Sequence, residues 1–509
     1  MSAKKISKTP KAPTAAKAAS STTSLFQKLF ENSNNLSVIC FLLLIICAAF
    51  SLSYPLSIRT ANGEQLFISS QSYAIIATAH ESLTNILEPQ GLLFSQSHIS
   101  APFSFAKILY GILMLIIPLW ILPALLSLIV ISLLWIALRK FTAPLSTKFI
   151  AVCMFAFTPL FVSSQLALGT QVFLFIAIIL LLLALNSHVH PILCALLAAI
   201  TCLFGPDILF AILLILVFAR PLKGFAPLQE QKKYTIIGSI IGLCAWLILA
   251  ILTHISWQTL VSIQTPDHFF VEFGAAQGQT VLLFILAIIG IVISWKQERR
   301  WNIVSSIALI AWSFFFPATS LLATAIISFF AATAFVRILG SKWQHQSLKI
   351  IVLATILISV LTSYFIYTDQ IIQSPPAAQD LAAYAFLAQN TPANAIILAS
   401  PQQGGFISYF SGRSTFITDD PTNGVFAARG RVVNSIFDSH ELSATMQMLR
   451  NQNVTYILVD PQLEVSNEWR EDQGGLALLL HNKVAFTLVY EKNYQIYRVN
   501  TNVSAADFI

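Results

Sequence analysis

Two acidic residues lie beside long apolar runs, where a charge is expensive. Asp207 is at the start of the run 206–219, and Glu272 shortly precedes the run 279–295. Acidic side chains near bilayer depth are rare and are often functional. A carboxylate can take a proton from a nucleophile, and several together can hold a hard divalent cation. The two residues are therefore candidates for acid–base or metal-assisted chemistry.

A polar segment at 55–102 carries further candidates. Glu64, Glu81 and Glu88 lie in it, and any of them could supply a base, although a solvated loop acid is the simpler interpretation. The histidines of the polar segments lack the spacing of metal ligands and are interpreted as structural: His80, His98 and His268. The segment is too long for a simple turn, which favours a functional role.

Other chemistries find little support in the sequence. All the cysteines fall inside apolar runs, so neither a disulfide framework nor a thiolate metal site is indicated. The polar region 369–509 shows neither a glycine-rich phosphate loop nor a Ser/His/Asp arrangement. The sequence therefore offers carboxylates as its main reactive groups.

The composition identifies the setting for these groups. Hydrophobic residues make up 56% of the chain and charged residues only 10%, which is far from the balance of an average soluble domain. The net charge of +7 is nearly accounted for by lysines in residues 1–30, so we expect no nucleic-acid partner. Residues 1–33 are predicted to be a disordered basic tail on the cytoplasmic side. The run 36–54 is too long for a typical signal peptide and is interpreted as a retained first span.

Apolar runs of suitable length predict about eleven membrane-spanning helices. The runs are 36–54, 119–138, 147–163, 171–186, 190–204, 206–219, 234–253, 279–295, 302–316, 319–336 and 350–367. Lysines and arginines gather in alternate connections, as expected of loops kept in the cytoplasm. This pattern predicts a multi-pass plasma-membrane protein with a cytoplasmic N-terminus and an extracytoplasmic C-terminal region.

One apolar stretch, 103–118, is left out of the count because a crossing there would spoil the alternation of charge. We expect it to lie in the membrane interface or to re-enter. The alternative is one long helix that continues into the second span with a kink at Pro118 and Pro123. The spanning region is therefore placed at 34–368, with its first external loop at 55–118.

The region 369–509 reads as a separate α/β domain outside the membrane. Helical spacing is found at 378–389 and 440–450, and short apolar or alternating strands are found at 395–398, 454–459, 484–490 and 494–499. Helices and strands in this order indicate a small domain built on a sheet.

Several segments in order resemble the GT-C membrane glycosyltransferases, the superfamily of archaeal and bacterial oligosaccharyltransferases and of protein mannosyltransferases. The segments are 63–83 (GEQLFISSQSYAIIATAHESL), 158–175 (TPLFVSSQLALGTQVFLF), 267–279 (DHFFVEFGAAQGQ), 400–421 (SPQQGGFISYFSGRSTFITDDP) and 453–464 (NVTYILVDPQLE). The resemblance implies a donor with a polyprenyl-phosphate-linked sugar, a protein or glycan acceptor, and a site on the outer membrane face. It also implies a divalent cation, Mg²⁺ or Mn²⁺, held by acidic residues.

The sequence departs from this pattern at the acidic positions. Gln71 stands in the place of the first-loop acid, and Thr170 with Gln171 replaces the second acidic motif. Gln402 and Gln403 stand where the C-terminal signature has its acid and aromatic residue. An amide can bind a phosphate or a sugar by hydrogen bonds, but it is neither a base nor a good metal ligand. Among the expected carboxylates only Glu272 remains at a matching position.

The resemblance leaves two hypotheses. The first is a GT-C-like glycosyltransferase homologue in which Glu272, or else Glu64 or Glu81, is the base. Gln71 would lie in the catalytic loop. The substrate contacts would be Arg413, Gln402, Gln403, Tyr409 and Gln171. Arg413 would hold a lipid phosphate, unless it forms an ion pair with Asp419 or Asp420. The second is a catalytically inactive binding or scaffolding subunit of a cell-envelope assembly. The glutamines favour the second hypothesis, whereas the retained Gly404, Gly405, Tyr409 and Arg413 favour a preserved cavity.

Overall fold

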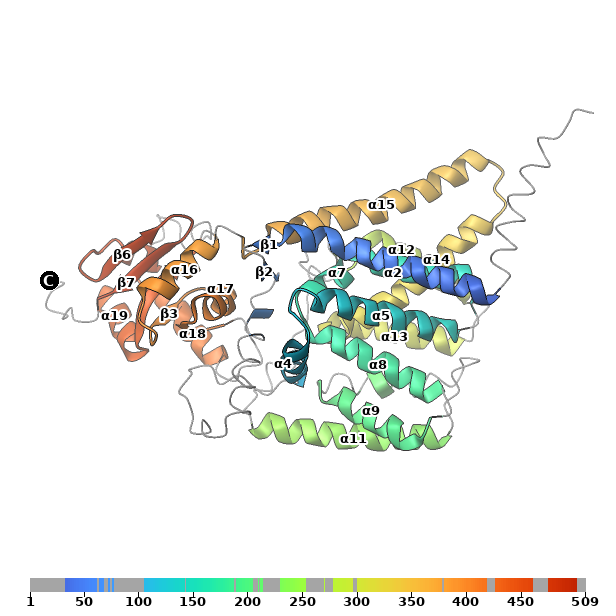
Figure 1. The fold of residues 1–509 in the computed structure, drawn as a ribbon, viewed down its shortest axis with the longest axis horizontal. Coiled ribbons are helices and arrows are strands. Elements are labelled where there is room, and N and C mark those ends of the chain that lie inside the picture. The colour runs from blue at the N-terminus through green and yellow to red at the C-terminus, as the bar shows by residue number, and fades with distance from the viewer. Residues whose placement is uncertain are drawn as a thin grey trace, which may run out of the picture.

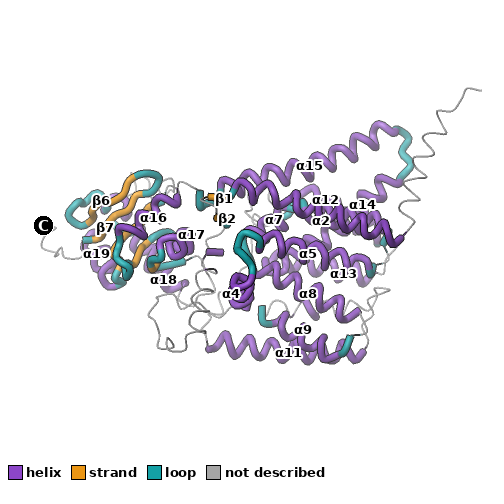
Figure 2. Tube along the Cα trace, viewed as in Figure 1, coloured by secondary structure: helices purple, strands orange, loops and turns teal. Residues whose placement is uncertain are grey.

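The computed structural model describes residues 33–61, 64–67, 72–73, 76, 105–141, 143–186, 189–204, 209, 211–213, 229–252, 270, 278–295, 300–377, 380–418, 426–460 and 475–500. A bundle of helices occupies one end of the molecule, and a smaller part with the main sheet follows it (Figure 1). Figure 2 shows that the strands gather in this smaller part, apart from two short ones at the junction.

The bundle is built from apolar helices, because a backbone in hydrocarbon must satisfy its own hydrogen bonds. They are α2 (Ser33–Ile58), α4 (Phe105–Ile116), α5 (Leu122–Arg139), α6 (Leu145–Ala156), α7 (Pro159–Leu166), α8 (Thr170–Asn186), α9 (Pro191–Cys202), α11 (Gln229–Leu252), α12 (Val281–Ser294), α13 (Arg300–Phe315), α14 (Ser320–Gly340) and α15 (Gln346–Gln373).

Within the described ranges, four helical segments are long and apolar enough to cross a membrane: Ser37–Ile58, Leu122–Arg139, Ser320–Gly340 and Gln346–Gln370. A fifth arises if α6 and α7, which meet at an angle of 54°, form one broken span. These helices make the chain a multi-pass membrane protein. The predicted count of about eleven spans is not confirmed. Shorter apolar helices do occupy several predicted spans, and most of 206–219 lies outside the described residues.

Glycines let two pairs of helices pack with their backbones in contact. A Cβ on Gly238 or Gly242 of α11 would collide with the backbone of Ala195 or Ala199 of α9, and one on Gly290 of α12 would collide with that of Phe330 of α14. Small residues commonly allow such close approach in membranes. Gly238 pairs with Ala195 and Gly242 with Ala199, so residue numbers increase in the same direction along both helices, and α9 and α11 run parallel.

The stretch 103–118 forms its own helix. Helix α4 ends at Ile116, and α5 begins at Leu122 after an irregular connection that contains Pro118. Figure 1 shows α4 lying across the end of the bundle that faces the sheet, not along α5. The alternative of one long kinked helix is therefore wrong. Proline removes a backbone donor and restricts the residue before it, which explains the break.

The smaller part contains a five-stranded mixed sheet. Its elements are α16 (Asp380–Asn390), β3 (Ile396–Leu398), α17 (Pro401–Phe406), the π-helical turn η6 (Ile407–Ser411), β4 (Ser414–Thr415), α18 (Phe426–Phe437), α19 (Leu442–Asn451), β5 (Val454–Val459), α21 (Gly475–Leu479), β6 (Phe486–Glu491) and β7 (Gln495–Val499). The strand order is β4-β3-β5-β7-β6. Strand β3 is parallel to β4 and β5, and β7 is antiparallel to β5 and β6. The predicted α/β character is confirmed, and every predicted helix and strand of this region is present.

Close packing of α12 on α14 yields a first prediction. Gly290→Ala places a methyl group against the Phe330 carbonyl, so we expect the free energy of unfolding to fall by about 1–3 kcal/mol. Gly340→Ala is the matched control, since a Cβ there meets nothing within 4 Å. Thermal unfolding of the two purified variants in detergent checks this. Equal melting temperatures would contradict the packing.

Candidate functional site

The segment that follows α2, here called the first loop, is attached to the bundle through Ser72 and Tyr73. The Ser72 hydroxyl donates to the backbone carbonyl of Ala167, 2.5 Å away, at the end of α7. The Phe67 N–H donates to the Tyr73 hydroxyl oxygen at 2.8 Å. Both Ser72 and Tyr73 are almost fully buried. These contacts fix the backbone directly after Gln71, which itself lies outside the described residues.

Tyr73 also joins the bundle to the smaller part of the molecule. Its ring lies 5.3 Å from that of Phe406, 5.1 Å from that of Tyr409 and 5.0 Å from that of Phe410. We call Tyr73, Phe406, Tyr409 and Phe410 the Tyr73 cluster. Tilted and edge-on rings at such distances attract one another beyond simple burial. The predicted site residue Tyr409 is thus packed directly against the first loop.

The turn between α7 and α8 forms the third part of the site. Leu168 adopts the left-handed region with φ of 45°, which a leucine rarely does. The Tyr110 hydroxyl of α4 donates to the Gly169 carbonyl at 3.1 Å, and its ring packs 4.5 Å from that of Phe173. The structure therefore brings together three of the segments singled out in the sequence: the first loop, the α7–α8 turn and the segment formed by the end of α17 and η6.

Neutral polar groups line one face of α14 beside this turn. The Ser320 hydroxyl donates to Gln171 Oε1 at 3.3 Å. One turn further along α14, Thr324 Oγ1 accepts from Gln279 Nε2, and Gln279 lies two residues before the start of α12. The predicted site residue Gln171 is half-buried, so its amide is positioned by α14 while part of it stays accessible.

The two glutamines of α17 have different surroundings. Gln402 is exposed, whereas Gln403 is 2% exposed and its Oε1 accepts from the Tyr384 hydroxyl at 2.7 Å. Burial raises the pKa of Tyr494, and hydrogen bonds with Tyr384 and with Gln403 partly oppose this rise. Gln403 therefore orders the interior behind the Tyr73 cluster. Substrate contacts by Gln402 and Gln403 stay predictions.

Behind Gln403 lies a buried acidic group. Burial raises the pKa of the Asp380 carboxyl, and hydrogen bonds from the Ala377 N–H and from Tyr494 partly oppose this. The Asp380 Oδ2 accepts from Ala377 N at 2.7 Å. Asp380 thus stabilises the start of α16 and is turned toward the interior.

Arg413 holds the other end of α16. Its Nε donates to Thr391 Oγ1 at 3.0 Å, and its Nη2 donates to the carbonyls of Ala388 and Thr391. A guanidinium at the end of a helix satisfies free carbonyls and offsets the helix dipole. Asp419 and Asp420, the predicted ion-pair partners, lie outside the described residues. Binding of a lipid phosphate by Arg413 stays a prediction.

The predicted carboxylates are only partly described. Glu64 lies on β2 (Glu64–Gln65), which pairs with β1 (Thr60–Ala61) at the start of the first loop. The other carboxylates and the three histidines lie outside the described residues: Glu81, Glu88, Asp207, Glu272, His80, His98 and His268. Among described residues, no three His, Cys, Asp or Glu side chains gather as metal ligands. The amides and hydroxyls at the site are poor ligands for Mg²⁺ or Mn²⁺, so the described part does not itself fit such a cation.

Arg59 is a structural residue that the sequence analysis missed. It is 3% exposed and donates to the carbonyls of Leu66 and Phe67 in the first loop. It also donates to the carbonyls of Ser374 and Pro375, which follow α15. The signal that could have identified it is a single cation directly after the first apolar run, on the side otherwise poor in positive charge.

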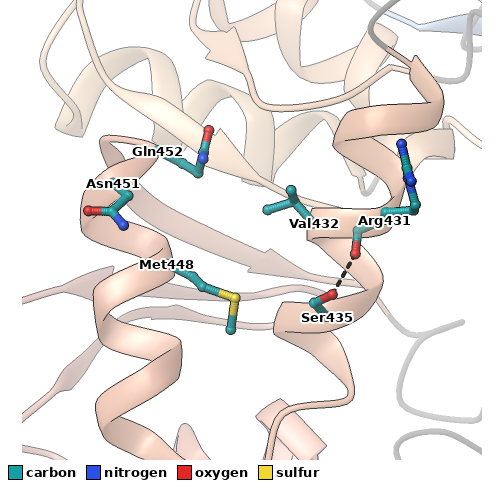
Figure 3. A pocket seen from close by; sticks show the side chains of 6 residues that line it. All are labelled: Arg431, Val432, Ser435, Met448, Asn451 and Gln452. Carbon is teal, nitrogen blue, oxygen red and sulfur yellow. Dashed lines mark hydrogen bonds between the residues drawn. The ribbon is translucent and has the colours of Figure 1, made fainter.

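A surface hollow lies elsewhere in the smaller part. Figure 3 shows side chains of α18 and α19 around a cavity of about 440 Å³, lined by Arg431, Val432, Ser435, Met448, Asn451 and Gln452. None of the site residues predicted from the sequence lines it. The hollow is therefore distinct from the site around the Tyr73 cluster.

Comparison with known proteins gives structural neighbours only. No family profile and no curated protein matches the sequence. The oligosaccharyltransferase AglB from Archaeoglobus fulgidus, in complex with an inhibitory peptide and a dolichol-phosphate, is 11% identical with a TM-score of 0.59 over 84% of this chain and 70% of that one. ArnT from Cupriavidus metallidurans, bound to undecaprenyl phosphate, is 12% identical with a TM-score of 0.53 over 91% of this chain and 98% of that one.

The Tyr73 cluster gives a second prediction. Tyr73→Ala removes the ring contacts of Tyr73 with Phe406, Tyr409 and Phe410, so we expect faster amide hydrogen exchange at 406–411 and a loss of about 3–5 kcal/mol in stability. Tyr73→Phe keeps the ring and removes the hydroxyl that accepts from the Phe67 N–H, so it should lose about 1–3 kcal/mol. Exchange at β7 is the internal control. Unchanged protection of 406–411 in Tyr73→Ala would show that the cluster does not hold the two parts together.

Proposed function

Proceeding from the GT-C glycosyltransferase fold of this chain, we propose that it handles a polyprenyl-phosphate-linked sugar at the outer membrane face and transfers the sugar to a protein or glycan acceptor. The alternative is a catalytically inactive binding or scaffolding subunit of a cell-envelope assembly that keeps the same cavity. The two hypotheses rest on the same site, and they differ only in whether a residue of that site activates the acceptor.

One observation carries the proposal. The first loop, the α7–α8 turn and η6 are far apart in sequence, yet Ser72, Tyr73 and Tyr110 tie them together at one end of the bundle. These segments are the ones whose sequence resembles the acidic motifs and the C-terminal signature of GT-C enzymes. Their convergence supports a preserved site, since unrelated loops have no reason to meet there.

The neighbours support the class of ligand. AglB is described with a dolichol-phosphate, and ArnT with undecaprenyl phosphate. Both are long lipids that carry a phosphate. We propose a donor of this class for the present chain, with membrane lipid around it.

The proposed reaction is a displacement at the sugar. The acceptor nucleophile forms a bond to the anomeric carbon, the bond from that carbon to the phosphate oxygen breaks, and polyprenyl phosphate leaves. Glu272, or Glu64 or Glu81, takes the nucleophile's proton. Gln171 and Gln402 hold donor hydroxyl or phosphate oxygens by hydrogen bonds, with Tyr409 beside them. No step is assigned to a metal ion.

Arg413 can serve this reaction only in a limited way, because its Nε and Nη2 already bond the end of α16. Its charge still acts on a phosphate at longer range. Arg413→Lys keeps this charge but loses the planar fork that fits the helix end. It therefore separates the attraction of a phosphate from the stabilisation of α16 better than Arg413→Ala does.

Charge distribution supports the outer placement of the site. Basic residues gather at the C-terminal ends of α5 and α14 and at the start of α15, which lie at the end of the bundle opposite the sheet (Figure 1). They are Arg139, Lys140, Arg337, Lys342 and Lys349. Since cytoplasmic connections carry the excess of Lys and Arg, this distribution supports an outer position for the sheet and the Tyr73 cluster.

A transfer assay tests the proposal. Purified full-length protein is incubated with radiolabelled polyprenyl-phosphate sugars, with and without Mg²⁺ or Mn²⁺. We expect transfer by the wild type, at least a hundredfold loss in Glu272→Gln if this residue is the base, and a smaller loss in Gln171→Leu. Glu491→Gln, at an exposed carboxylate of β6, is the matched control and should retain full activity.

The assay also decides between the two hypotheses. Donor binding without transfer, in protein that melts cooperatively, would exclude the enzyme and leave the binding subunit. Absence of both binding and transfer across the panel would leave only a scaffold. Activity that persists in Glu272→Gln but is lost in Glu64→Gln or Glu81→Gln would move the base to the first loop.

A further inference from the structure

The turn between α5 and α6 concentrates positive charge without any acid. Arg139 ends α5, Lys140 follows it, and Lys148 lies in the first turn of α6. Residues 139–149 contain no Asp or Glu. Arg139 and Lys140 are exposed, so their charged heads are available to a ligand.

Lys148 differs from an ordinary surface lysine because it is only 9% exposed. Its Nζ donates to the backbone carbonyl of Arg139 at 3.3 Å. Among the described residues no carboxylate forms an ion pair with it. Buried cations in proteins are normally paired, because removing a charge from water is costly.

Two further features of this turn disfavour a lone ammonium. The charge of Arg139 repels it, and the N-terminal end of α6 carries the positive pole of the helix dipole. An anion at the turn would offset all three effects that disfavour the charged Lys148: its burial, its repulsion by Arg139 and the positive end of the helix dipole. A neutral ligand would offset none of them.

The surroundings indicate where that anion comes from. Ile136, one turn before Arg139 and Lys140, is 45% exposed, and Ile129 on the same helix is 37% exposed. The turn therefore borders the apolar surface of a spanning helix, at the end of the bundle opposite the sheet (Figure 1). Phospholipid headgroups lie at this boundary, and juxtamembrane cations attract anionic ones.

We propose that the α5–α6 turn is a binding site for the phosphate of an anionic membrane phospholipid. Lys148 donates to the phosphate from the buried side, and Arg139 and Lys140 close around it from the exposed side. The site is at the opposite end of the bundle from the Tyr73 cluster and does not depend on the proposed transfer function.

Native mass spectrometry of the full-length protein, titrated with phosphatidylglycerol or phosphatidylcholine, tests the site. We expect the wild type to retain phosphatidylglycerol at least tenfold more tightly than phosphatidylcholine. Lys148→Gln should weaken the binding of phosphatidylglycerol at least tenfold and leave the binding of phosphatidylcholine unchanged. Lys349→Gln is the matched control, because Lys349 also lies in the first turn of a helix and donates to a backbone carbonyl, that of Ser341, but is more exposed. We expect its effect to stay within twofold.

Other outcomes overturn the proposal. Equal affinity for the two lipids, or an equal loss in the Lys148 and Lys349 variants, would reduce the site to general attraction by a basic surface. Displacement of phosphatidylglycerol by inorganic phosphate at millimolar concentration would indicate a free-anion site instead. If Lys148→Gln does not fold, Arg139→Gln in the same titration must show the tenfold loss, and an unchanged affinity there would refute the site.

Discussion

The buried guanidinium of Arg59 is the interaction on which the rest of the architecture depends. It lies directly after the first span and binds carbonyls of the first loop on one side and of the segment after α15 on the other. A planar, permanently charged fork can satisfy several carbonyls at fixed angles, which a flexible ammonium cannot. The first span, the first loop and the entrance to the smaller part are thereby held at one point, and the position of the sheet relative to the bundle follows from it.

From this anchor the site is assembled by contacts that do not involve the predicted carboxylates or amides. Ser72 binds a carbonyl of α7, Tyr73 packs against η6, and Tyr110 binds the Gly169 carbonyl. Backbone carbonyls and aromatic rings therefore hold the chain at 72–73 and at 167–169. The Ala167 and Gly169 carbonyls accept these bonds whichever side chains stand at 170 and 171.

Sequence patterns predicted local structure well where hydrophobic spacing determines it. The strand at 454–459 is found as predicted, and the apolar runs mark the bundle helices, because burial and backbone hydrogen bonding act locally there. The roles of Gln403 and Arg413 were not predictable in this way. Their partners, Tyr384 and Thr391, are brought close only by the tertiary fold. The sequence does not distinguish a polar residue that faces a cavity from one that binds a buried helix end. Arg59 was missed for the same reason, since its acceptors lie 315 positions away in the chain as well as nearby.

Amides in place of acids, at a site where several segments come together, have a physical consequence for the fold. Carboxylates brought close together repel one another and need a cation or protons to stay there. Gln171 instead accepts a hydrogen bond from Ser320, and Gln279 donates one to Thr324, so both amides are held against α14 by hydrogen bonds between neutral groups. A neutral site of this kind favours ligands that exchange hydroxyl and amide hydrogen bonds over ligands held through a metal. In the proposed reaction the acceptor proton is therefore taken by a carboxylate other than these amides, at Glu272 or at Glu64 or Glu81.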